Sequence, residues 1–231
     1  MVSASRRAHG LKLRLGYEAR IVTYYKFLRL KDDQVVSDWD GSTWKKNEWR
    51  DIACNPVLQA QGFYASGCIA DAVQWFGDVL AEVEVRGRSV PGRVMSAHQG
   101  MRVTRAWEFS SQDWLGLAIY TAELVLPIFE SRFPDDNRPR TAIGSGFAAD
   151  AADAAGSAAA IGARSAAHAA RAAVAAADAM TRKADVAAYA AQAVKSADGA
   201  AHGISAAARA DVHNNIEKWL RERISMMRPL W

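Results

Sequence analysis

The sequence predicts an α+β protein, in which a small strand-rich N-terminal domain with one short helix precedes an all-α, alanine-rich helical bundle. Between residues 20 and 110, short runs of β-branched and aromatic residues are separated by turn residues, as is typical of strands. From Ser111 onward, apolar residues recur at helical spacing, and in residues 148–210 about every second residue is alanine. These changes predict three segments: a basic arm (1–16), an α+β domain (17–110) and an alanine-rich helical domain (111–231).

The α+β domain is expected to hold several strands and one helix. The run RIVTYYKFLRL (20–30) predicts a strand, and the turn-rich segment that follows it holds only short extended pieces around Val35 and Trp44. A short helix at 69–77 should be closed by Gly77. Further strands are expected at 61–66, 79–85 and 101–109.

The helical domain should begin with one long helix. Ser111 is its expected N-cap, and the apolar spacing continues to about residue 130, although Pro127 predicts a kink or an early end. A second helix should follow Pro134, with Asp136 or Asn137 as its cap.

The alanine tract is expected to form short antiparallel helices, because alanine favours helix but buries little area. Breaks are predicted at 144–146, 162, 181–185 and 199–203. The larger apolar residues that should anchor the packing are Ile161, Val174, Met180, Val186, Tyr189, Val194 and Ile204. The last helix should pack on the 113–130 helix through Ile216, Trp219, Leu220, Ile224 and Met227.

The charged stretch FPDDNRPRTAI (133–143) is interpreted as a joint between two helices rather than as an active site. Its aspartates lie at the positive end of the following helix dipole, and Arg138 and Arg140 can pair with them or with Glu130. Every charge then has a structural role, and no histidine or polar nucleophile lies nearby in the sequence.

The chain carries a formal net charge of +4, and its N-terminal arm is basic. Such an arm suits nucleic acid or another anionic surface, since each neutralised phosphate releases counterions; a solubilising leader is the alternative. The arm residues expected to contact an anionic partner are Arg6, Arg7, Lys12 and Arg14. No secretory signal or membrane-spanning run is visible, so we expect free thiols at Cys54 and Cys68 and a location in the host cytoplasm or in a virion.

Two parts of the chain resemble known domain families. The segments GFYAS, AVQWFGDVLAEVEVRG and MSAHQGMRVTRAWEF resemble a small uncharacterised domain of phage and prophage-type proteins. The segment LVLPIFESRFPDDNRPRTAI, followed by alanine-rich helices, resembles the immunity protein family whose domain often lies beside the first. Together the resemblances cover most of residues 17–210, and they imply a phage-type protein without established catalytic residues.

The α+β domain is also similar to the ADP-ribosyltransferase fold in the order of its strands and short helix. This resemblance implies an enzyme or an NAD-binding domain, with Arg29 as the early basic residue and Ser66 as the strand-end hydroxyl. Gln99 stands where the family has its catalytic glutamate, so only a remnant transferase site is implied.

A separate candidate site lies in the segment DWDGSTWKKNEWR, where tryptophans and cations are interleaved. Such a pattern can stack on bases or sugars, although tryptophans in a strand-rich domain also fill its core. The candidate ligand contacts are Trp39, Trp44, Trp49, Lys45, Lys46 and Arg50.

No metal and no cofactor is predicted, because the histidines and cysteines lack metal-binding spacing. The sets considered are His168, His202 and His213 with Asp178, Asp198 or Asp211, and Cys54 and Cys68 with His98.

The leading hypothesis is a non-enzymatic phage or prophage-type protein that acts through protein–protein contacts. It would serve as an immunity or counter-defence factor or as an accessory virion component, with self-association through the alanine-rich helices as a further expectation. The alternative is an ADP-ribosyltransferase-like enzyme or NAD-binding domain in the N-terminal half.

Overall fold

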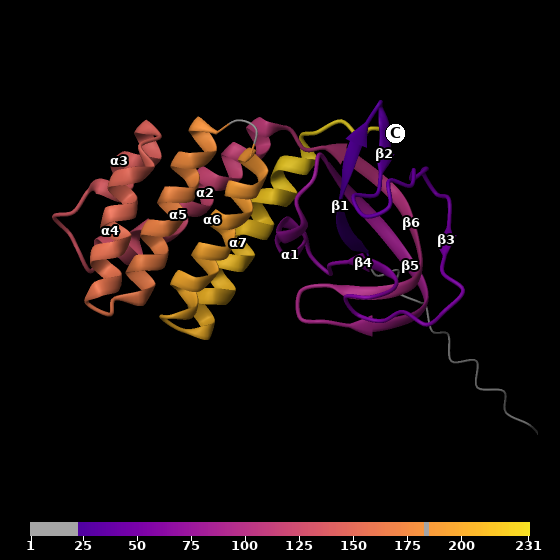
Figure 1. Cartoon of the computed structure of the whole chain (residues 1–231), viewed down its shortest axis with the longest axis horizontal. Helices are drawn as coiled ribbons and strands as arrows, with labels where there is room; N and C mark the ends of the chain where they lie inside the picture. Colours follow the sequence, from indigo (N-terminus) through magenta and orange to yellow (C-terminus); the bar gives the residue numbers. More distant parts are fainter. Residues whose placement is uncertain (1–22, 183–184) are drawn as a thin grey trace, which may run out of the picture.

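The computed structural model describes residues 23–182 and 185–231 and confirms the α+β layout (Figure 1). A curled antiparallel sheet lies in residues 24–108, and helices make up most of the chain that follows. The basic arm and the first residues of the strand expected at 20–30 lie outside the described residues. Within the described ranges, no helix has the length and apolar character needed to cross a membrane.

The sheet has six strands in the order β2-β1-β5-β6-β3, with β4 also paired with β6. All of these pairs are antiparallel. The strands are β1 (Tyr24–Lys31), β2 (Gln34–Val36), β3 (Arg50–Asp51), β4 (Phe63–Ala65), β5 (Val79–Pro91) and β6 (Ser96–Glu108).

The β5–β6 hairpin is longer than predicted. Its strands, expected at 79–85 and 101–109, extend into the polar segment between them, where Ser89 still pairs with His98. Hydrophobic alternation fails to predict this part because residues 86–89 of β5 are exposed, and Ala97 and His98, which are buried on the same part of β6, are small or polar, while backbone pairing continues. Two register shifts in the hairpin increase the local twist and help to curl the sheet.

The helices are α1 (Ile69–Ala72), α2 (Ser111–Glu130), α3 (Arg138–Ser145), α4 (Ala148–Ala160), α5 (Arg164–Thr181), α6 (Val186–His202) and α7 (Ala206–Ser225), with a 3-10 turn η1 (Val73–Trp75) after α1. These bounds confirm the predicted breaks near 144–146, 162 and 181–185, whereas the break predicted at 199–203 begins later, because α6 continues through Gly199 to His202. The predicted N-cap at Ser111 is wrong by one residue, because the Ser110 hydroxyl and the Asp113 carboxylate form the capping box of α2. Pro127 lies within α2, which continues to Glu130.

Alanine forms the centre of the helical region. Ten alanines of α5, from Ala166 to Ala179, are buried, and α5 lies beside α2, α3, α4 and α6. The predicted anchors Val186 and Val194 are buried, and Val174, Met180 and Tyr189 are partly buried. The prediction is wrong for Ile161 and Ile204, which are 62% and 56% exposed because each lies just beyond the end of a helix.

Three of the four charges of the stretch 133–143 pair as predicted for a joint, whereas Asp135 forms no ion pair with a described residue. Arg138 contacts Asp136 and Arg140 contacts Glu130, with nitrogen–oxygen distances of 2.7 Å in both pairs. The Asp136 carboxylate also accepts a hydrogen bond from the backbone N–H of Arg138 at the start of α3. Asn137 is the N-cap residue, but its side chain makes no capping hydrogen bond.

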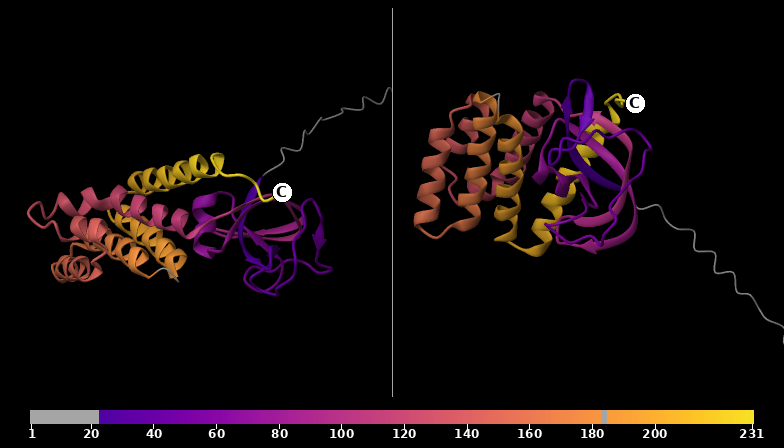
Figure 2. Two further views of the ribbon diagram at one scale, coloured as in Figure 1. Left: turned by 90° about the horizontal axis from the view of Figure 1, so that it is seen from above. Right: turned by 45° about the vertical axis from the view of Figure 1, so that its right-hand side comes forward.

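The last helix returns to both parts of the fold, as Figure 2 shows from above. The predicted packing of α7 on α2 is confirmed, since the Trp219 and Tyr120 rings stack with centroids 5.7 Å apart. Beyond α7, the backbone N–H of Leu230 donates to the carbonyl of Ala106 on β6 at 2.8 Å. One buried apolar cluster contains Phe27 of the sheet together with the alanines of the helices, so the two parts share a core.

Two glycine substitutions are expected to have effects of opposite sign. A Cβ at Gly77 would lie 2.3 Å from the carbonyl oxygen of Leu28 on β1, so Gly77→Ala should lower the free energy of unfolding by about 1–2 kcal/mol. Gly156 lies within α4 with open space around it, so Gly156→Ala should raise that free energy by about 1 kcal/mol. Urea denaturation of both variants measures the difference; a neutral Gly77→Ala would contradict the close approach of η1 to β1.

Candidate functional site

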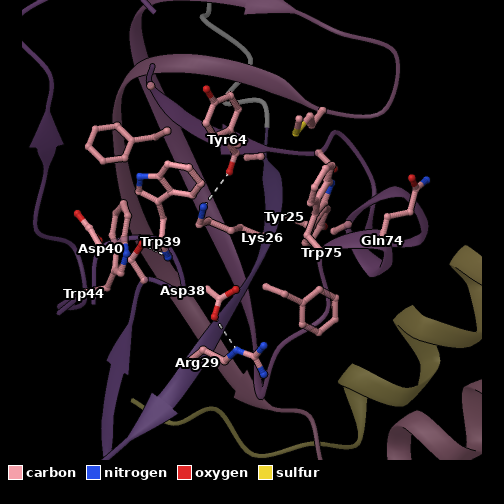
Figure 3. A pocket seen from close by; sticks show the side chains of 18 of the residues that line it. Tyr25, Lys26, Arg29, Asp38, Trp39, Asp40, Trp44, Tyr64, Gln74 and Trp75 are labelled. Atoms are coloured by element: carbon pink, nitrogen blue, oxygen red, sulfur yellow. Dashed lines mark hydrogen bonds and ion pairs between the residues drawn. The ribbon is translucent and has the colours of Figure 1, made fainter. Parts of the chain in front are cut away.

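The candidate site is a pocket of about 700 Å³ on the N-terminal part of the chain. Its walls come from β1, from the loop after β2, from the segment that leads into β4, and from η1 (Figure 3). This volume lies in the range of pockets that hold small molecules. The lining includes three tryptophans and three cationic side chains: Trp39, Trp44, Trp75, Lys26, Arg29 and Arg50.

Lys26 provides the central positive charge of the pocket. It lies on β1 between Tyr25 and Phe27, and its Nζ donates to the backbone carbonyl of Tyr64 at 3.3 Å. Burial lowers the pKa of Lys26 to about 8; the carboxylates of Asp40 and Asp38 oppose this shift and Arg50 adds to it. In the described parts of the chain, Lys26 forms no ion pair with a carboxylate, whereas Arg29 pairs with Asp38 at 2.9 Å. The ammonium group is therefore the charge in this pocket that a ligand can neutralise.

A buried tryptophan and an arginine form one wall. Trp44 is almost wholly buried, and its ring packs edge to face on Phe63 at 5.5 Å between centroids. The guanidinium of Arg50 lies 4.5 Å from the centre of the Trp44 ring and 3.7 Å from Asp40. The Nε1 of Trp44 and one terminal nitrogen of Arg50 are buried without a hydrogen-bond acceptor in the described structure. Buried donors without an acceptor are costly, so these two nitrogens make this wall of the pocket less stable.

The loop after β2 holds Trp39 at the rim. The backbone N–H of Ser37 donates to the carbonyl of Ser42 at 2.9 Å, and the Asp40 carboxylate accepts from both the N–H and the hydroxyl of Ser42. The hydrogen bonds from Ser42 lower the pKa of Asp40 to about 2, so this carboxylate stays ionised. Within this braced loop, Trp39 is 95% exposed. Tryptophan is enriched at binding interfaces, because its ring is largely apolar and its N–H can donate a hydrogen bond.

A third tryptophan lies on the other side of the pocket. Trp75 ends η1 and is 50% exposed. Figure 3 shows Trp39 and Trp44 on one side of Lys26 and Trp75 on the other. The pocket thus combines aromatic faces on two sides with a cation between them, which suits a ligand that carries both a flat ring and negative charge.

Only some residues of the two candidate sites predicted from the sequence line this pocket. Trp39, Trp44 and Arg50 of the tryptophan-rich set and Arg29 and Ser66 of the transferase-like set all line this pocket. Ser66 is almost wholly buried and exchanges backbone hydrogen bonds with Tyr25.

The other predicted residues lie elsewhere. Trp49 lies below the guanidinium groups of Arg86 and Arg102, at 4.3 and 4.8 Å. Lys45 is exposed and pairs with Glu48, and Lys46 is also exposed. Gln99 accepts a hydrogen bond from the backbone N–H of Arg88, away from the pocket. The anionic-partner set Arg6, Arg7, Lys12 and Arg14 lies outside the described residues.

Sequence reasoning did not identify Lys26 and Trp75. A signal for Lys26 is present, since it is a charged residue between Tyr25 and Phe27 in a strand of large apolar residues. Trp75 belongs to a short helical run that predicts core packing, and only the three-dimensional fold places it opposite Trp39.

Comparison of the chain with protein-family models, with curated proteins and with solved structures found no match.

Proposed function

We propose that the chain is a non-enzymatic protein of phage or prophage type that acts by binding, as an immunity or counter-defence factor or as an accessory virion component. The sequence resemblances support the phage-type role, and the pocket supports a binding role. The transferase alternative has less support, because Gln99 both replaces the expected glutamate and lies away from the pocket.

The ligand class that suits the pocket best is a nucleotide or dinucleotide. The observation that carries this proposal is the position of Lys26, a cation without a carboxylate partner among the described residues, between Trp44 and Trp75. A flat base can stack on the exposed tryptophan faces, while a phosphate meets the ammonium group. Arg50 lies beside the same wall and can add a second donor to phosphate.

Replacing Lys26 by methionine should weaken nucleotide binding by about tenfold or more, because a charge-assisted hydrogen bond contributes about 1.5–3 kcal/mol. Isothermal titration calorimetry with ADP measures this change. Lys31→Met is the matched control, since Lys31 ends the same strand, is exposed and does not line the pocket. Equal affinities of the two variants would contradict the proposed site.

The same binding should depend on pH. With a pKa of about 8, the Lys26 ammonium is charged near pH 7 and mostly neutral near pH 9, so ADP affinity should fall as the pH rises through this range. Lys26→Met should remove most of this fall. An affinity that is independent of pH in the wild-type protein would show that Lys26 does not contact the phosphate.

A second binding surface, for a protein partner, is supported by the exposed isoleucines of the helical region. Ile161 follows α4 and Ile204 follows α6, and Figure 1 shows these two helix ends along the same edge of the molecule.

We propose self-association through this edge. Light scattering should show that the double change of Ile161 and Ile204 to aspartate lowers the molar mass in solution, whereas Phe147→Asp, at an exposed residue near the opposite end of α5, should not. A molar mass that the double change leaves unaltered would contradict self-association through this edge.

A further inference from the structure

Three potential metal ligands converge where α7 packs on α1. Cys68 is the N-cap residue of α1, Asp71 lies in its first turn, and His213 lies on α7. The Cys68 Sγ is 3.6 Å from the His213 Nε2, which is 3.3 Å from the Asp71 Oδ1. All three ligand atoms lie within 4.8 Å of one another.

Two of the three distances between the ligand atoms match the spacing of ligands around a tetrahedral zinc ion. With bonds of about 2.3 Å to sulfur and about 2.0–2.1 Å to nitrogen and oxygen, tetrahedral angles separate sulfur from nitrogen by about 3.5 Å and nitrogen from oxygen by about 3.3 Å. The observed separations in the Cys68–His213–Asp71 cluster are 3.6 and 3.3 Å. Cysteine, histidine and aspartate are also the ligand types that zinc prefers.

The arrangement differs from that of a nucleophilic cysteine with its base. In such a triad the carboxylate binds the ring nitrogen that faces away from the nucleophile. Here Cys68 and Asp71 both face the same nitrogen, Nε2 of His213. One ring nitrogen approached by a thiol and a carboxylate is a geometry in which all three groups can share a cation.

The nearby Glu217 is not available as a fourth ligand of the cluster. Glu217, one helical turn after His213, is engaged, because its carboxylate accepts from the backbone N–H of Ala70 at 2.8 Å and pairs with Arg221 at 2.6 Å. The Asp71 and His213 side chains are partly exposed, so water can reach the cluster. A fourth ligand position would therefore be open to water, as in zinc sites with three protein ligands.

We propose that Cys68, Asp71 and His213 form a site for a divalent cation of the zinc class. The ion would join α7 to α1, two helices whose ligands are 145 residues apart in the chain. Because α1 continues directly into η1, the ion would also fix the wall of the pocket that carries Trp75. The spacing of histidines and cysteines in the sequence predicted no metal site. The site is proposed here because the fold brings together three ligands that are far apart in the chain.

Cobalt substitution tests the site, since a thiolate bound to Co²⁺ gives a charge-transfer absorption band in the near ultraviolet. The full chain is freed of metal with a chelator and titrated with CoCl₂, and then with ZnCl₂ in competition. We expect a band that saturates at about one equivalent and is displaced by zinc. Cys68→Ser should abolish the band, and Cys54→Ser, which removes the other cysteine, should retain it.

A second variant keeps the test decisive if Cys68→Ser alters folding. Asp71→Asn preserves the shape of the side chain, and it should weaken Co²⁺ binding by about 100-fold or more, beyond the usual effect of residues outside the ligand set. Circular dichroism of each variant confirms that the fold is retained. A missing band in the wild-type protein, a band that depends on Cys54, or unchanged affinity in Asp71→Asn would overturn the proposal.

Discussion

Replacing Ala169 by leucine is expected to lower the free energy of unfolding by about 3 kcal/mol, at the upper end of the range for overpacked cores. Ala169 is fully buried on α5, which has neighbouring helices on several sides. The buried residues of α4 are all alanines and most of those of α6 are alanines, whose short side chains cannot rotate away to make room. The three added carbon atoms must then displace a helix.

A matched substitution separates packing from helix propensity. Ala152 lies in the alanine tract on α4 but is exposed, so Ala152→Leu should change the free energy of unfolding by less than about 0.5 kcal/mol. Urea denaturation of both variants gives the two values. If Ala169→Leu is as neutral as Ala152→Leu, the alanine helices are not closely packed around α5.

Replacing Asp113 by alanine should lower the free energy of unfolding by about 2–4 kcal/mol, because it removes a helix cap and a charged hydrogen bond together. Asp113 is buried at the start of α2, and its carboxylate accepts from the backbone N–H of Ser110 at 2.8 Å. It also accepts from the Nε of Arg223, near the end of α7, at 2.5 Å. The loss of Asp113 therefore loosens both the start of α2 and the docking of the last helix.

Asp135→Ala is the control for this change, since Asp135 is exposed in the joint before α3 and should contribute little. Thermal and urea denaturation should give a clearly lower free energy of unfolding for Asp113→Ala than for Asp135→Ala. Similar stabilities would show that the capping box and the α7 contact do not hold α2 in place. An Arg223→Met variant should reproduce only the part of the loss that comes from α7.

Much of the fold could be predicted from local sequence signals. Glycine, proline and charged residues often mark helix ends, so most of the breaks in the alanine tract and the pairing of Arg138 and Arg140 were predictable. Gly199 was misleading, because α6 continues through it to His202. The exposure of Ile161 and Ile204 was not, because a large apolar residue beyond a helix end has the same sequence signature as a core anchor.

The site was less predictable, since it is assembled from segments that are far apart in the chain. Trp39, Trp44 and Arg50 come from one tryptophan-rich segment and were identified, whereas Lys26 and Trp75 come from a strand and a 3-10 turn that predict core packing. The cluster of Cys68, Asp71 and His213 likewise has no spacing signal, because α7 returns to α1 only in the folded chain.

The proposed nucleotide pocket is tested most directly by following the indole N–H resonances of the eight tryptophans by NMR during titration with ADP. Each resonance is assigned by a single tryptophan-to-phenylalanine variant. If ADP binds in the pocket, the resonances of Trp39, Trp44 and Trp75 should shift and reach saturation. The resonances of Trp49 and Trp219, which lie outside the pocket, should not move. Shifts confined to Trp49 or Trp219, or no saturable shift in any tryptophan, would contradict binding of ADP in the pocket.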